Sequence, residues 1–165
     1  LGDDIMSDNV EFDGDLYRLP CPLNAMLQNG WNISPKVDVD HLASGDGGTL
    51  ELIRNGKKKN VSIRNLDTEA HYLENCFVTF IADGDGTLVL PKGIRVGMAS
   101  SEFLKALEQS GYTYTQSESD SLDFYYIYHD KDTSSLDNLY VSVNKNGKNA
   151  GKIFTVQYSR REFPD

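Results

Sequence analysis

The sequence predicts an α+β fold built as a tandem duplication, in which each unit is a helix followed by three or four antiparallel strands, with the helices packed on one sheet face. Three observations lead to this prediction: a clearly amphipathic helix at 94–112, a shorter copy of it at 20–30, and alternating, strand-like segments after each. We expect residues 11–83 to form the first unit and residues 84–165 the second, with separate sheets or with one continuous sheet through both.

The ten residues before the first unit have a different character. Residues 1–10 carry three aspartates and show little periodicity, which is typical of a flexible, solvated tether. A tether ahead of a strand-rich domain favours an extracellular or cell-surface protein, lipid-anchored through a segment outside this chain. Because the chain begins with Leu1, we expect that any leader has been removed.

The overall charge argues against two classes of partner. The chain has 165 residues and a formal net charge of −9. Nucleic acids and anionic membrane surfaces bind basic footprints, so we expect neither as a partner. The sequence has no run of the roughly 18 apolar residues that a membrane-spanning helix needs.

Apolar residues recur at helical spacing in both predicted helices. In the second helix, Phe103, Leu104 and Leu107 form one stripe, and Gly111 can adopt the left-handed conformation that ends a helix. The first helix follows prolines, which suit a first turn because their missing N–H would be unpaired there. Its apolar stripe consists of Leu23, Met26 and Leu27.

Alternation of apolar and polar residues predicts the strands. In the first unit, Asn55-Gly56 favours a two-residue hairpin turn between strands at 49–54 and 60–65, and a buried strand follows at 76–82. In the second unit, strands are expected at 112–115, 122–129, 138–144 and 152–160. The residues predicted to point inward are Leu50, Leu52, Val61, Ile63, Leu139, Val141, Val143, Phe154, Val156 and Tyr158.

The two units share their ends as well as their element order. A Leu-Pro pair precedes each helix and a Gly-aromatic pair follows it: Leu19-Pro20 and Gly30-Trp31 in the first unit, Leu90-Pro91 and Gly111-Tyr112 in the second. These shared boundaries support the predicted duplication.

A short motif at the second helix suggests a family. Val96-Gly97-Met98, followed by a helix that ends in glycine, resembles the start of repeats in the beta-lactamase-inhibitor-protein-like group. The resemblance implies tandem helix–loop–four-strand units and a general protein-binding role, with no inhibitory residue and no target carried over. The chain departs from the pattern at Ala99, where the group has threonine or serine. As a whole, it also resembles an uncharacterised secreted lipoprotein family of Gram-positive, gut-type bacteria.

The two cysteines leave two alternatives open. Paired, Cys21 and Cys76 would close a loop of about 55 residues and stabilise the fold by ~4 kcal/mol. Unpaired, they would be buried thiols. Both fall in the first unit, whereas the resembled group has a cysteine pair in each repeat.

No catalytic, cofactor-binding or metal-binding motif emerges from the sequence. The segment 83–88 resembles the middle of a calcium-binding EF-hand loop, but Ile81 and Lys92 occupy the first and twelfth ligand positions, so a tight turn is expected instead. The three histidines lack the spacing of a metal site. We expect a protein that is not an enzyme and has no cofactor.

Tyrosines on one sheet face are the strongest indication of function. In the strand 138–144 the inward phase is apolar, which places Tyr140 on the opposite face, whereas the strand 122–129 is apolar in both phases. Exposed tyrosines are typical of protein-binding surfaces. The predicted protein-binding face consists of Tyr125, Ile127, Tyr140, Thr155 and Gln157. Alternatively, the two units pack these faces against each other.

The sequence therefore favours a non-catalytic extracellular or cell-surface protein-binding module, inhibitor-like in type, with an unknown protein partner. A structural or assembly component of the cell envelope is the first alternative. An uncharacterised enzyme is the second.

Overall fold

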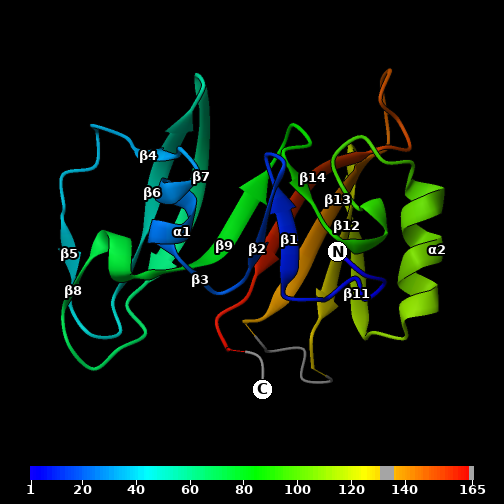
Figure 1. Ribbon diagram of the computed structural model, residues 1–165. Helices are drawn as coiled ribbons and strands as arrows, with labels where there is room; N and C mark the ends of the chain where they lie inside the picture. Colours follow the sequence, from blue (N-terminus) through cyan, green and yellow to red (C-terminus); the bar gives the residue numbers. More distant parts are fainter. Residues whose placement is uncertain (131–135, 164–165) are drawn as a thin grey trace.

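The structure is a computed structural model that describes residues 1–130 and 136–163. These residues form fourteen strands, two α-helices and two short 3₁₀ helices, and one nine-stranded antiparallel sheet dominates them (Figure 1). The predicted α+β class, with helices packed on the sheet of each unit, is therefore wrong. The protein is mostly β, because the first helix has only six residues and strands hold far more of the described residues than helices do.

The large sheet has the strand order β11-β12-β13-β14-β9-β7-β6-β4, and β3 pairs additionally with β9. The strands after the first helix and those after the second lie in this one sheet, because β9 pairs with β14. Its strands are β3 (Cys21–Pro22), β4 (Asn32–Ile33), β6 (Gly47–Arg54), β7 (Lys57–Arg64), β9 (Phe77–Asp83), β11 (Tyr114–Glu118), β12 (Leu122–Tyr128), β13 (Asn138–Asn144) and β14 (Ile153–Ser159).

The hairpin turn predicted between β6 and β7 is confirmed. Asn55 has φ 50° and Gly56 has φ 78°, the positive values that a type I′ turn requires. Asn146-Gly147 also predicts a hairpin turn by its composition, but it lies within a longer connection between β13 and β14.

A small three-stranded sheet packs on one face of the large sheet, which we call the inner face (Figure 1). It has the order β10-β1-β2, and a separate ribbon pairs β5 with β8. The bounds of these elements, with the 3₁₀ helices η1 and η2, are β1 (Asn9–Phe12), β2 (Asp15–Arg18), β5 (His41–Leu42), β8 (His71–Tyr72), η1 (Leu73–Asn75), β10 (Leu88–Val89) and η2 (Pro91–Gly93).

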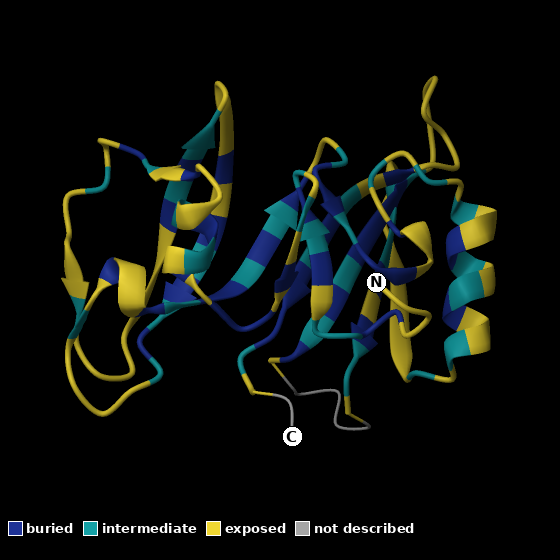
Figure 2. Ribbon diagram, in the orientation of Figure 1, coloured by how far each residue is buried: buried dark blue, intermediate teal, exposed yellow. Residues whose placement is uncertain are grey.

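The two α-helices are α1 (Leu23–Gln28) and α2 (Ser100–Ser110). Helix α2 turns its buried residues toward the sheet and its exposed residues away from it (Figure 2). The ring of Phe103 meets the ring of Tyr125 edge-on, with centroids 5.5 Å apart, and Gly111 ends the helix at φ 74° as predicted. Neither helix is apolar and long enough to cross a membrane, within the residues that the structure describes.

The hydrophobic core lies on the inner face of the large sheet. Leu139 and Val141 are fully buried there, as predicted. Phe154 was predicted to point inward as well, but its side chain is 47% exposed. The reason is an irregularity in the β13–β14 pairing: Ser142 is opposite Thr155, whereas Val143 is opposite Ile153, so Phe154 is an extra residue in its strand.

The solvated state expected for residues 1–10 does not hold for Ile5 and Met6, which are 1% exposed. The hydroxyl of Tyr158 on β14 donates to the backbone carbonyls of Met6 and Ser7, at 2.9 Å each. Asp8 lies 2.5 Å from Nε of the buried Arg160. These contacts hold the N-terminal segment against the inner face. The predicted boundary between residues 83 and 84 falls at the end of β9, inside the shared sheet.

Both cysteines are free and buried. Burial raises the pKa of the Cys21 thiol to about 12 and also raises the pKa of Cys76. Of the two alternatives, the structure has the buried, unpaired thiols.

Candidate functional site

The predicted protein-binding face is divided between the two sides of the sheet. Tyr125 (5% exposed) and Ile127 (fully buried) lie on the inner face under α2, which corrects their predicted exposure. Tyr140, Thr155 and Gln157 lie on the opposite face and are half-buried. The correction arises because β12 is apolar in both phases, and packing against Phe103 selects the phase that contains Tyr125.

An aromatic cluster occupies the opposite face, which we call the open face. In the strand register, Tyr126 is opposite Tyr140, which is opposite Gln157. The Tyr126 and Tyr140 rings are 4.8 Å apart, and the Phe124 ring stacks on Tyr140 at 6.1 Å. The residues of the open face are Phe124, Tyr126, Tyr140, Phe154, Thr155 and Gln157. They lie outside the hydrophobic core cluster.

Two features hold this face in shape. The hydroxyls of Ser142 and Thr155 are 2.6 Å apart and join β13 to β14 beside the aromatic rings. The extra residue in β14 turns the Phe154 side chain outward, where it is 47% exposed, and Tyr126 is 41% exposed. Sequence reasoning missed Phe124, Tyr126 and Phe154, since no local signal in the sequence marks either the phase of β12 or the irregularity in β14.

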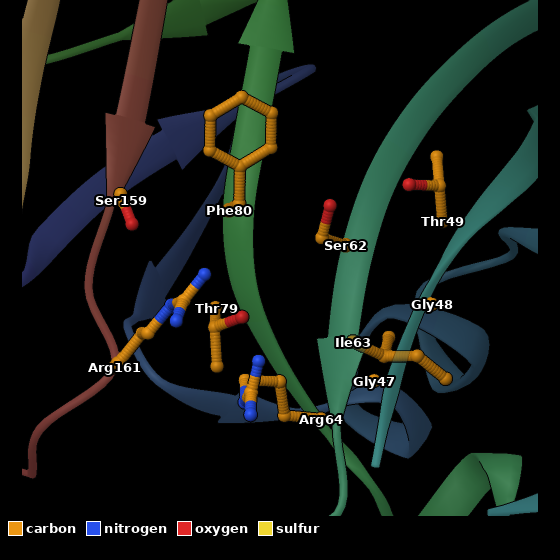
Figure 3. Close-up of a pocket in the computed structure, with 10 residues that line it drawn as sticks. All are labelled: Gly47, Gly48, Thr49, Ser62, Ile63, Arg64, Thr79, Phe80, Ser159 and Arg161. Atoms are coloured by element: carbon orange, nitrogen blue, oxygen red, sulfur yellow. The ribbon is translucent and has the colours of Figure 1, made fainter. Parts of the chain in front are cut away.

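A pocket of about 410 Å³ continues the open face over the first half of β9, where β14 ends and β6 begins (Figure 3). Ser62, Phe80 and Ser159 face it side by side, because Phe80 is opposite both Ser62 on β7 and Ser159 on β14. Ser159 follows Gln157 by two residues, so the pocket lies on the same side of the sheet as the aromatic cluster. The remaining polar side chains that line it are those of Thr49, Arg64, Thr79 and Arg161.

The two arginines of the pocket come from different parts of the chain: Arg64 is the last residue of β7, and Arg161 follows the end of β14. Figure 3 shows the guanidinium groups of Arg64 and Arg161 both directed toward Thr79. Arg64 donates from Nη2 to the carbonyl of Gly45 (3.0 Å), and the backbone N–H of Arg161 donates to Asp137 (2.6 Å). Among residues 1–130 and 136–163, no carboxylate forms an ion pair with either guanidinium.

Gly47 makes room for the Arg64 side chain. The two residues are directly opposite in the β6–β7 pairing. A Cβ at residue 47 would lie 3.1 Å from Cγ of Arg64 and 3.0 Å from the carbonyl oxygen of Ile63, which is tighter than ordinary contact. The sequence contained Gly47 and both arginines, but their convergence depends on pairing between distant strands.

A separate polar cluster joins Lys59 on β7 to the turn that follows β9. Lys59 is 3.1 Å from Asp83 and 2.5 Å from Asp85. Burial raises the pKa of Asp83. Burial also favours a higher pKa for Asp85, but hydrogen bonds with Asp83, Lys59 and Thr87 outweigh this effect, so the pKa of Asp85 is lowered. The backbone N–H of Gly86 donates to Asp83 at 2.8 Å. The predicted tight turn is confirmed, and its carboxylates form ion pairs with the buried Lys59.

Each histidine lies beside an aspartate at the surface. Nδ1 of His41 is 2.7 Å from Asp40, and Nε2 of His71 is 2.8 Å from Asp67. Within the described ranges, no three His, Cys, Asp or Glu side chains come together as a metal site would require. The open face with its aromatic cluster and the arginine pocket are therefore the candidate binding site.

Comparison of the chain with protein-family models, with curated proteins and with solved structures finds no match.

Proposed function

We propose that this protein is a non-catalytic, cell-surface binding module that docks a protein partner on the open face of its large sheet. The observation that carries the proposal is the cluster of Phe124, Tyr126, Tyr140 and Phe154 on the face opposite the core. Large aromatic side chains at a surface favour protein association, because burying them gains apolar contact while the tyrosine hydroxyl still forms hydrogen bonds.

The arrangement of the cluster supports the same role. The ring of Tyr140 contacts the rings of Phe124 and Tyr126, so these side chains have less conformational entropy to lose when a partner packs on them. The phenol of Tyr140 is neutral at pH 7 and can donate a hydrogen bond to a partner; burial raises its pKa further above the ordinary value. Thr155 and Gln157 add polar groups beside the rings, as is typical of interfaces that combine aromatic anchors with hydrogen bonds.

The sequence supports protein binding and surface location independently. The segment Val96-Gly97-Met98 and the helix after it resemble a group that includes a protein inhibitor. The strand-rich chain also resembles secreted lipoproteins. These resemblances give the proposal its class of partner, a protein, and its place, the cell surface.

The proposal is tested by capture with matched variants. The protein is immobilised and exposed to an envelope extract of the source organism, in parallel with a Tyr126→Ala/Tyr140→Ala variant and a Tyr72→Ala variant. Tyr72 is 61% exposed but lies on β8, away from the open face, so it controls for the loss of a surface tyrosine.

We expect one protein to be retained in about equal amount by the wild-type chain and by Tyr72→Ala, and to be lost with the double variant, since aromatic anchors carry roughly 2 kcal/mol or more of binding energy. Retention by the double variant would refute the open face as the docking surface. Retention of cell-wall polymer instead of protein would favour a structural role in the envelope.

A further inference from the structure

The arginine pocket is a concave site lined by two positively charged side chains and several hydroxyl groups. None of the ten residues that line it is acidic, although the protein as a whole carries a net charge of −9. Arg64 and Arg161 nevertheless both reach toward the region of the pocket around Thr79 (Figure 3). The two positive charges repel each other, and an anion bound between them would remove this repulsion and be attracted by both.

The donors of the pocket match a carboxylate. A guanidinium presents a planar fork that binds the two oxygens of a carboxylate in parallel. The side chains of Ser62, Thr79 and Ser159 supply hydroxyl groups around the same space. A volume of about 410 Å³ falls in the range of roughly 300–1,000 Å³ that is usual for ligand pockets.

The position of the pocket indicates what carries the carboxylate. It lies on the same side of the sheet as the aromatic cluster, and Phe80 is among its lining residues. A partner lying on the rings of Tyr126 and Tyr140 therefore reaches the arginines along the same surface. Charge complementarity then selects a partner with an acidic group at this position.

We propose that the Arg64–Arg161 pocket binds a carboxylate of the protein partner, from an aspartate, a glutamate or the C-terminus, while neighbouring partner residues pack on the aromatic cluster. This inference rests on the proposed function, because it specifies the chemistry of the partner at one end of the open face. The arginines fix the position of the partner along the sheet, and the aromatic rings provide the contact area.

A displayed library of random peptides tests the proposal. Peptides are selected on the wild-type protein, on Arg64→Gln/Arg161→Gln, on Tyr126→Ala/Tyr140→Ala, and on Arg18→Gln, a control for loss of an exposed arginine on β2. We expect wild-type and Arg18→Gln to select peptides with an aspartate, a glutamate or a free C-terminus at a fixed distance from an apolar residue. Loss of both arginines should abolish that preference and weaken binding of the selected peptides by roughly ten- to a hundredfold.

Arg161→Lys is a second informative variant. It keeps the charge but loses the planar fork, so binding should fall to a value between wild type and Arg64→Gln/Arg161→Gln. Selected peptides without an acidic preference, or unchanged affinity in the double arginine variant, would overturn the assignment of the pocket. If only the double tyrosine variant lost affinity, the open face would remain the docking surface, but the pocket would not be part of it.

A second measurement keeps the two proposals separable if no peptide is selected. The wild-type protein is titrated with sodium acetate against sodium chloride at equal ionic strength, and the backbone amide signals are followed by NMR. Saturable shifts at Thr79, Phe80 and Ser159 that disappear in the double arginine variant would retain the carboxylate pocket while the protein-docking surface falls. Absence of such shifts, together with absence of peptides, would overturn both.

Discussion

The inner and open faces of the large sheet are both rich in aromatic residues, yet only the inner face is covered. Tyr125 and Tyr126 are neighbours in β12, but Tyr125 is 5% exposed under α2 and Tyr126 is 41% exposed on the other side. Adjacent residues in a strand point to opposite faces. Helix α2 covers the face that contains Tyr125, so Tyr125 is a core residue and its neighbour Tyr126 is a surface residue. The comparison teaches that aromatic content alone does not identify a core.

The largest expected contrast between the faces is in stability. Phe103→Ala removes the ring that packs on Tyr125 and should lower the free energy of unfolding by about 3–5 kcal/mol. Tyr126→Ala, on the open face, should lower it by only about 1 kcal/mol or less. Urea denaturation of both variants measures the difference. Equal losses would mean that the open face also belongs to a packed core.

A smaller effect should follow from the contacts of Tyr158 on the inner face. Tyr158→Phe removes the donor that serves the carbonyls of Met6 and Ser7, and should destabilise the protein by about 1–3 kcal/mol. Hydrogen exchange should also become faster in residues 5–8, because this donor holds the N-terminal segment in place. Tyr126→Phe is the matched control, since it removes a hydroxyl from the open face; similar exchange in both variants would contradict the anchoring role.

The effect that is smallest near neutral pH concerns the thiol of Cys21, whose contribution to stability changes only in alkaline solution. Burial raises its pKa in the folded state to about 12, above the unfolded value of 9.0. Between these values the unfolded chain loses the proton while the folded chain keeps it, so the stability that this group contributes is complete below pH 9 and declines up to pH 12. Burial raises the pKa of Tyr158 as well, with the same sign.

Denaturation of the wild-type protein and of Cys21→Ala across this pH range measures the effect. The wild-type free energy of unfolding should fall more steeply with pH than that of the variant, by at most about 1.4 kcal/mol per pH unit. Parallel curves would show that Cys21 titrates in the folded state as it does in the unfolded chain. The thiol should also resist alkylation at pH 8, because the reactive form is the thiolate.

The sequence by itself determined features that depend on a few neighbouring residues. The turn at Asn55-Gly56 follows from the positive φ values that these residues tolerate, and the end of α2 follows from Gly111. The phase of β13 was also predictable, because Leu139 and Val141 alternate with polar residues or Tyr140 and leave one apolar face. Local chemistry is sufficient for such features.

Only the tertiary structure decided which strands share a sheet and what each face meets. The sequence left open whether its two predicted units share one sheet; pairing of β9 with β14 unites their strands in a single sheet, and the N-terminal segment packs into the core. The phase of β12 depends on contact with Phe103, about twenty residues earlier in the chain.

The candidate site also depends on long-range contacts. Gly47 and Arg64 become neighbours through the β6–β7 pairing, and Arg161 joins them from beyond β14. No periodicity in the sequence links these three positions, because their proximity is produced by strand pairing across nearly the whole chain. The sequence therefore determined the hairpin turn, the longer strands and the second helix, and the sheet as a whole decided the binding surface.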